Sequence, residues 1–120
     1  MTRRGYLGVA IMALSLAMVA GHRGTTVARA AMPMTEQVGA AKTAADHEAL
    51  AADYERMATD AKSQAEEHRS MAKAYRKAGG PAAKAQLPEH CEGLAKYYEG
   101  VAKEYAAMAR AHRELAKKAK

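Results

Sequence analysis

The sequence predicts an all-α protein, an antiparallel hairpin of two long helices that resembles a coiled coil. Three observations predict it. Residues 31–120 contain 25 alanines but only four Leu, two Val, five Met and five Tyr as large apolar residues. Two long stretches rich in strong helix formers show apolar residues at alternating spacings of three and four. Gly-Gly-Pro at residues 79–81 separates the two stretches.

An export signal is predicted at the start of the chain. Arg3 and Arg4 precede an apolar run over residues 7–20, and residues 28–30 read Ala-Arg-Ala. This order is typical of a secretory signal peptide, here residues 1–30. The run is shorter than the roughly 20 apolar residues that a membrane-spanning helix needs. We therefore expect cleavage, a periplasmic or extracellular protein and no stable membrane span. An uncleaved anchor is the alternative, and the paired arginines also resemble a twin-arginine signal.

The charge of the remaining chain excludes some classes of protein. Residues 31–120 carry 15 Lys and Arg against 13 Asp and Glu, so their net charge is only +2. Nucleic-acid binding by phosphate neutralisation needs a larger excess of basic residues, so we expect no nucleic-acid partner. Glycine and β-branched residues are too few for a β-fold. No nucleophile stands out with a base and an orienting group, so we expect a protein that is not an enzyme.

The hairpin is predicted over residues 44–120, after a flexible leader at residues 31–43. The first helix is expected over residues 44–78, followed by a loop over residues 79–87. The second helix is expected over residues 88–119. Its start is indicated by a proline, which suits the first turn, and its end by lysines, which suit the negative end of the helix dipole.

The alternation of three and four defines one seam on each helix, as in a coiled coil. On the first helix the seam comprises His47, Leu50, Tyr54, Met57, Ala61, Gln64, His68, Met71 and Tyr75. On the second helix it comprises Cys91, Leu94, Tyr98, Val101, Tyr105, Met108, His112, Leu115 and Ala119. The seams collect nearly all the large apolar residues, and with them three histidines and the single cysteine.

The two helices are also repeats of each other. A shift of 44 residues aligns residues 46–76 with residues 90–120 and gives 11 identities in 31 positions. Four of the identities are alanines, which carry little weight in a chain of this composition. The others are Glu48/Glu92, Leu50/Leu94, Tyr54/Tyr98, Glu55/Glu99, His68/His112, Arg69/Arg113 and Lys73/Lys117. His47 aligns with Cys91.

Two registers of the hairpin are open. One places His47 against His112, Tyr54 against Tyr105, and His68 against Cys91. A slide of one heptad would place Tyr54 against His112 instead. The first register is favoured because it pairs polar seam residues with each other and leaves fewer buried groups without partners.

In the favoured register, ligand-type residues meet at both ends of the hairpin. His68, His90 and Cys91 form a candidate three-ligand site at one end, and His47 and His112 form a candidate two-ligand site at the other. The ends are 21 residues apart, about 31 Å along a helix, so they would be separate sites. Thiolate and imidazole are good ligands for copper(I) and zinc. A cysteine near a helix N-terminus also favours the thiolate form.

The sequence thus predicts an exported protein that binds copper(I) or zinc in a handling or sensing role. A homodimer that forms a four-helix bundle is also predicted, because two helices with one thin seam leave much apolar surface uncovered. The alternative is a structural or partner-binding helical module of the cell envelope without a ligand. A third interpretation is noncovalent haem held by histidines between two hairpins. Seam histidines that are merely packed and hydrogen-bonded remain the simplest alternative.

Overall fold

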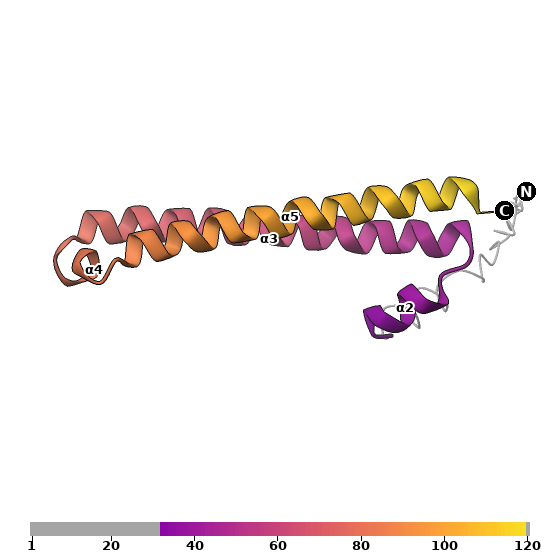
Figure 1. Ribbon diagram of the computed structural model, residues 1–120, viewed down its shortest axis with the longest axis horizontal. Coiled ribbons are helices and arrows are strands. Elements are labelled where there is room, and N and C mark those ends of the chain that lie inside the picture. Colours follow the sequence, from indigo (N-terminus) through magenta and orange to yellow (C-terminus); the bar gives the residue numbers. More distant parts are fainter. Residues whose placement is uncertain (1–31, 120) are drawn as a thin grey trace, which may run out of the picture. The chain divides into compact units, whose positions relative to one another are not determined.

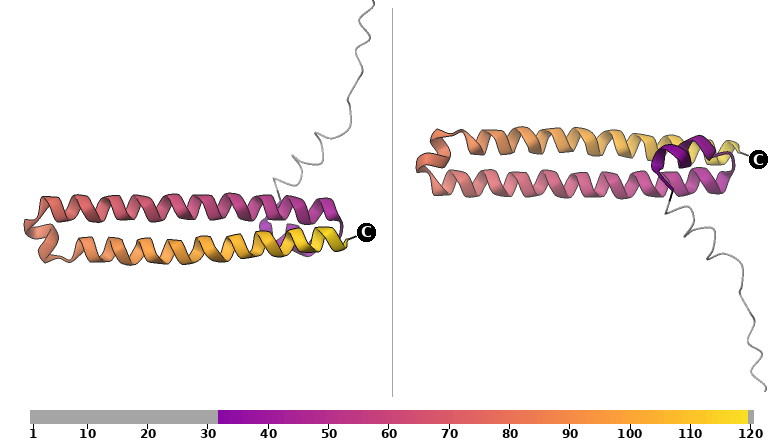
Figure 2. Two further views of the ribbon diagram at one scale, coloured as in Figure 1. Left: turned by 90° about the horizontal axis from the view of Figure 1, so that it is seen from above. Right: turned by 90° about the horizontal axis from the view of Figure 1, so that it is seen from below.

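The computed structural model describes residues 32–119, and the predicted signal peptide lies outside them. The described residues form α2 (Met34–Ala40), α3 (Ala44–Ala78), α4 (Gly80–Lys84) and α5 (Leu87–Lys118). Helices α3 and α5 are antiparallel and pack side by side along their length (Figures 1 and 2). The predicted all-helical fold and its two long helices are confirmed for this part of the chain. Within it, no helix is both long and apolar enough to cross a membrane.

Helix α3 has the predicted boundaries, and local hydrogen bonds explain both ends. Thr43 Oγ1 accepts a hydrogen bond from the Asp46 N–H, and the Asp46 carboxylate accepts one from the Thr43 N–H. This reciprocal capping box satisfies backbone donors that the first turn would leave unpaired. At the other end Gly79 adopts a φ of 60°, which costs glycine little.

Three segments differ from the prediction. The predicted loop at residues 79–87 contains the single-turn helix α4, with Pro81 in its first turn, where a missing N–H costs nothing. The predicted flexible leader contains α2, which begins after Pro33. The second long helix spans residues 87–118 instead of 88–119. Gln86 precedes it in a left-handed conformation with φ 56°, which turns the chain into α5.

Besides Leu50, Ala61 and Cys91, the buried core of the hairpin consists of alanines seven residues apart on each helix. We call these residues the alanine columns. They are Ala51, Ala58, Ala65 and Ala72 on α3, and Ala95, Ala102, Ala109 and Ala116 on α5, and all are buried. A column of methyl groups lets two helix axes approach to the short end of the usual range, because no longer side chain holds them apart.

The predicted core therefore needs correction. Seam residues Leu94, Met108 and Leu115 were expected between the helices, but their side chains are 44%, 39% and 45% exposed. The alanine columns each lie next to the seam on the helix surface. Because close approach is possible only along these columns, the contact between α3 and α5 turns towards them and away from part of the predicted seam. Among the seam positions, Leu50, Ala61 and Cys91 stay buried, and the histidines and tyrosines are partly buried.

A larger side chain in an alanine column should destabilise the hairpin. We expect Ala109→Leu to lower the free energy of unfolding by about 1–3 kcal/mol, because the leucine must push α3 and α5 apart. Thermal unfolding followed by circular dichroism measures the change. The matched control is Ala107→Leu, two residues away on the same helix at an exposed position. Equal unfolding temperatures for the two variants would show that the columns do not set the helix spacing.

Candidate metal-binding site

Histidine and tyrosine rings line the contact beside the alanine columns. The Tyr54 and His112 rings stack with centroids 5.5 Å apart and planes tilted by 15°. The His68 and Tyr98 rings stack with the same centroid distance and a tilt of 10°. Tyr105 also stacks on Tyr54, at 6.1 Å. These rings and His47 are called the ring ladder below. Their flat faces fill the space between the helices that alanine methyl groups cannot reach.

His47 and His112 meet at one end of the ring ladder, as the sequence predicts. The two Nδ1 atoms lie 3.1 Å apart, and both residues are partly buried. A hydrogen bond at this distance has one nitrogen as donor and the other as acceptor, with the roles set by the tautomers of the two rings. The contact brings two imidazoles with directed nitrogen atoms to one point, which is the requirement for a shared ligand.

The observed pairing lies between the two registers that the sequence left open. The contacts of His47 with His112 and of Tyr54 with Tyr105 belong to the favoured register. The contact of Tyr54 with His112 belongs to the alternative. The rings interdigitate, so His112 lies between two residues of α3 instead of opposite one. Such insertion of one side chain between two of the facing helix is the usual packing in coiled coils.

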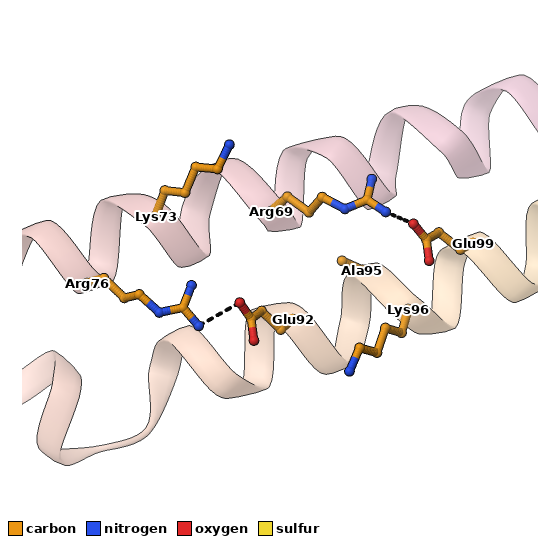
Figure 3. Close-up of a pocket in the computed structure, with 7 residues that line it drawn as sticks. All are labelled: Arg69, Lys73, Arg76, Glu92, Ala95, Lys96 and Glu99. Carbon is orange, nitrogen blue, oxygen red and sulfur yellow. Dashed lines mark hydrogen bonds and ion pairs between the residues drawn. The ribbon is translucent and has the colours of Figure 1, made fainter.

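Among residues 32–119 four ion pairs cross from α3 to α5, and one of them is the 4.0 Å contact of Arg113 with Glu48. We call the side that carries them the charged face. Glu55 binds Arg113 with two hydrogen bonds, one of which measures 2.8 Å. Arg69 pairs with Glu99, and Arg76 pairs with Glu92 at 2.6 Å. Figure 3 shows the last two pairs, which line a shallow pocket between the helices beside Ala95. Exposed pairs of this kind stabilise a protein only slightly, but they fix the register of the two helices.

The hydrogen bonds from Arg113 lower the pKa of the Glu55 carboxyl below its ordinary value. The same contact raises the pKa of the Arg113 guanidinium. Both side chains are nearly half exposed, so water screens the interaction and its effect on stability is small. Because the glutamate is ionised more easily in the folded chain, the contact favours folding wherever this carboxylate is charged.

The contacts of the hairpin obey the sequence repeat. Adding 44 to each α3 residue of a contact, and subtracting 44 from each α5 residue, gives the equivalent contact, an operation called the repeat exchange below. It converts the Glu55–Arg113 ion pair into the Arg69–Glu99 ion pair. It also converts the stack of Tyr54 on His112 into the stack of His68 on Tyr98. The hairpin therefore has an approximate two-fold symmetry that exchanges α3 with α5.

The other predicted site lies where α3 ends and α5 begins. Cys91 is a free thiol and is buried, and His90 beside it in the sequence is exposed. The Nδ1 atom of His68 is buried and has no hydrogen-bond partner. Among residues 32–119 there is no group of three or more His, Cys, Asp or Glu side chains that could hold a metal ion. Each end thus offers ligand-type residues in smaller number than a closed metal site requires.

The ion pairs of the charged face were missed at the sequence level, although their signal was present. Glu55, Glu99, Arg69 and Arg113 are all among the identities of the repeat. In an antiparallel hairpin of two repeats, an acid and a base that both repeats carry form the same cross-helix pair twice, once from each helix. This spacing could have been used to set the register before the structure was known.

Searches against protein-family models, curated proteins and solved structures found no match to this chain.

The Glu55–Arg113 contact predicts a particular pH dependence. Its contribution to stability is present above the ordinary glutamate pKa of 4.5 and is lost as the pH falls through the lower folded-state value. We expect Glu55→Gln to lower the unfolding temperature slightly at neutral pH. On acidification, the unfolding temperature of this variant should fall less than that of the unchanged chain. Melting curves recorded at stepwise lower pH measure both. Glu67→Gln is the control, because the described structure shows no ion pair for that exposed residue. An identical acid response of both variants would contradict the prediction.

Proposed function

We propose that the chain binds a transition metal, zinc or copper(I), at the two ends of the ring ladder, and that it acts as an exported protein in metal handling or sensing. The observation that supports the proposal most is the 3.1 Å separation of His47 Nδ1 and His112 Nδ1. Imidazole nitrogen is a common ligand of both metals.

The separation of the two nitrogens fits a tetrahedral ion. Zinc binds imidazole nitrogen at about 2.0–2.1 Å, so two ligands of a tetrahedral zinc are about 3.3 Å apart. The separation of His47 and His112 is within a few tenths of an ångström of that value. The metal would take the place of the proton shared by the two rings, and only a small side-chain movement would be needed. Proton release on binding follows from this exchange.

The repeat exchange extends the proposal to the second end. It converts the pair of His47 and His112 into the pair of Cys91 and His68. The buried, unpartnered Nδ1 of His68 is the equivalent of the His112 nitrogen that contacts His47. A thiolate at residue 91 would give this end a sulfur ligand, so it would favour copper(I) or zinc, whereas the imidazole pair is less selective. His90, next in sequence, is the further candidate ligand.

The small number of ligands at each end favours transfer or sensing over permanent storage. Structural zinc sites are closed by four protein ligands, whereas open sites leave positions for other molecules. A site with two or three protein ligands leaves at least one position for a donor or acceptor of the ion. The ion would also crosslink α3 to α5, and this would stabilise a hairpin whose core consists mainly of alanine.

Metal titration tests the proposal. We expect zinc or copper(I) to raise the unfolding temperature. Binding should add about 2.7 kcal/mol to the free energy of unfolding when the free metal concentration is a hundred times its dissociation constant. Isothermal titration calorimetry should resolve one binding event for each end. His112→Ala should remove the event at the His47 end, and His68→Ala should remove the event at the Cys91 end.

Each variant is the control for the other, because the ends are separate. Cys91→Ser should leave the His47 end unchanged and weaken copper(I) binding more than zinc binding. An unfolding temperature that does not change with either metal, or that rises equally in the unchanged chain and in both histidine variants, would contradict the proposal.

A partner-binding helical module without a ligand is the second candidate, favoured by the half-exposed Leu94, Met108 and Leu115. The homodimeric four-helix bundle predicted from the sequence would be one form of it. This candidate predicts a protein with no response to metals. It also predicts that polar substitutions of these three residues weaken binding to a partner chain and leave the fold of the hairpin unchanged.

A further inference from the structure

A groove runs along the charged face between α3 and α5. It consists of two adjoining hollows, which share Arg69 and Glu99 as lining residues. The first hollow is the pocket beside Ala95 (Figure 3), and the second has a volume of about 670 Å³. We call the two hollows together the basic groove, which is lined by side chains from residues 62–76 of α3 and 92–110 of α5. The volume of the second hollow lies within the range found for ligand-binding sites.

Positive charge is concentrated in the basic groove. Seven Lys and Arg side chains line it against three Glu side chains, which gives a net charge of +4. The other residues of the described range 32–119 carry seven Lys and Arg against ten Asp and Glu, a net charge of −3. The hairpin is thus divided into a positive groove and a negative remainder. A hollow lined mainly by one sign of charge concentrates the electric field and attracts the opposite charge.

The glutamates of the basic groove are all held by arginines. Arg69 pairs with Glu66 and Glu99, and Arg76 pairs with Glu92. In Figure 3, dashed lines join both arginines to glutamates of α5, whereas no line reaches the lysines of this pocket.

Five cations of the basic groove therefore form no ion pair among residues 32–119, and we call them the free cations. They are Lys62, Lys73, Lys96, Lys103 and Arg110. All five are exposed, and they come from both helices. The groove thus offers a row of positive charges that the described part of the chain does not neutralise.

The free cations depart from the repeat, whereas the ion pairs that join the helices follow it. The repeat exchange converts the Glu55–Arg113 pair into the Arg69–Glu99 pair. Four of the five free cations have a repeat equivalent that is not basic. These pairs are Lys62/Ala106, Lys96/Ala52, Lys103/Thr59 and Arg110/Glu66. Neither the symmetry of the hairpin nor its register requires these charges, so they are available to bind a molecule outside the chain.

We infer that the basic groove binds a short, extended acidic segment of another polypeptide. Residues 92–110 extend over about 27 Å of α5. A single small anion would contact the free cations at one end of this length only. An extended chain advances about 3.3 Å per residue, so a segment of about eight residues spans the groove. Its carboxylates would accept charge-assisted hydrogen bonds from the ammonium and guanidinium groups.

The charges outside the groove argue for a short acidic segment over other occupants. A nucleic acid or an anionic membrane surface would extend beyond the groove, where the remainder of the described chain is negative and would repel it. The start of this chain does not fit either, because residues 1–31 contain four Arg and no Asp or Glu. A segment confined to the groove meets the positive charge alone.

Binding of fluorescein-labelled octaglutamate tests the inference. Fluorescence anisotropy at low salt should show binding that weakens as salt is added. EDTA is present, so that no metal ion contributes. Lys62→Glu combined with Lys103→Glu should lower the affinity about tenfold, because two attractive contacts become repulsive.

The matched control combines Lys42→Glu with Lys84→Glu. It changes the net charge equally, at exposed positions outside the basic groove. Its affinity should stay within about twofold of the unchanged chain, because salt screens distant charges. Circular dichroism checks the fold of each variant, and Lys73→Glu combined with Lys96→Glu is the second variant if the first does not fold.

Several results would overturn the inference. One is an octaglutamate that does not bind, and another is an equal loss of affinity in the groove variant and in the control. Citrate that competes as strongly as unlabelled octaglutamate would assign the groove to small anions instead. Tighter binding of octathymidylate or of phosphatidylglycerol vesicles would assign it to a nucleic acid or a membrane. Because the measurement is made without metal, its result leaves the metal proposal to its own titration.

Discussion

The close approach of α3 and α5 along the alanine columns is the constraint on which the rest of the hairpin depends. Methyl groups fill little space, so the two backbones must come together to exclude water. The side chains on either side of the columns are then positioned by the short distance between the two helices. On one side long charged side chains can reach across the contact, and on the other side large apolar residues are turned outward. The rings of the ladder lie flat because the remaining space is narrow.

Much of this fold could be predicted from the sequence, because its signals are local. An uninterrupted run of strong helix formers determines the length of α3. Gly79, followed by Gly80 and Pro81, ends that helix. The choice of core residues could not be predicted from hydrophobicity, which ranks leucine and methionine above alanine. The four alanines shared by both repeats looked uninformative in an alanine-rich chain. They are the columns, because at this contact small size matters more than apolar area.

The candidate site was predicted in part for a similar reason. The meeting of His47 with His112 follows from periodicity and antiparallel pairing alone. The stacking of Tyr54 on the same histidine does not, because interdigitated side chains contact two neighbours, whereas a single antiparallel register assigns each residue one partner. Periodicity shows which side of a helix a residue occupies. It does not determine the position along the facing helix at which its partner lies. The cross-helix pairs of glutamate and arginine fix that position along the helix, and the repeat of these residues in the two halves was the sequence signal for it.

The approximate two-fold symmetry has a consequence for how such a molecule could arise. A single helix carrying the shared residues would satisfy its own copy, since each acid would find a base and each tyrosine a histidine in the opposite strand of an antiparallel pair. The present chain joins two such helices through residues 79–86. Covalent fusion frees the halves to diverge, and residue 91, a cysteine where the first half has a histidine, is the clearest mark of that divergence. The repeat thus accounts for the shared architecture of the two halves, and residue 91 for the difference between their two ends.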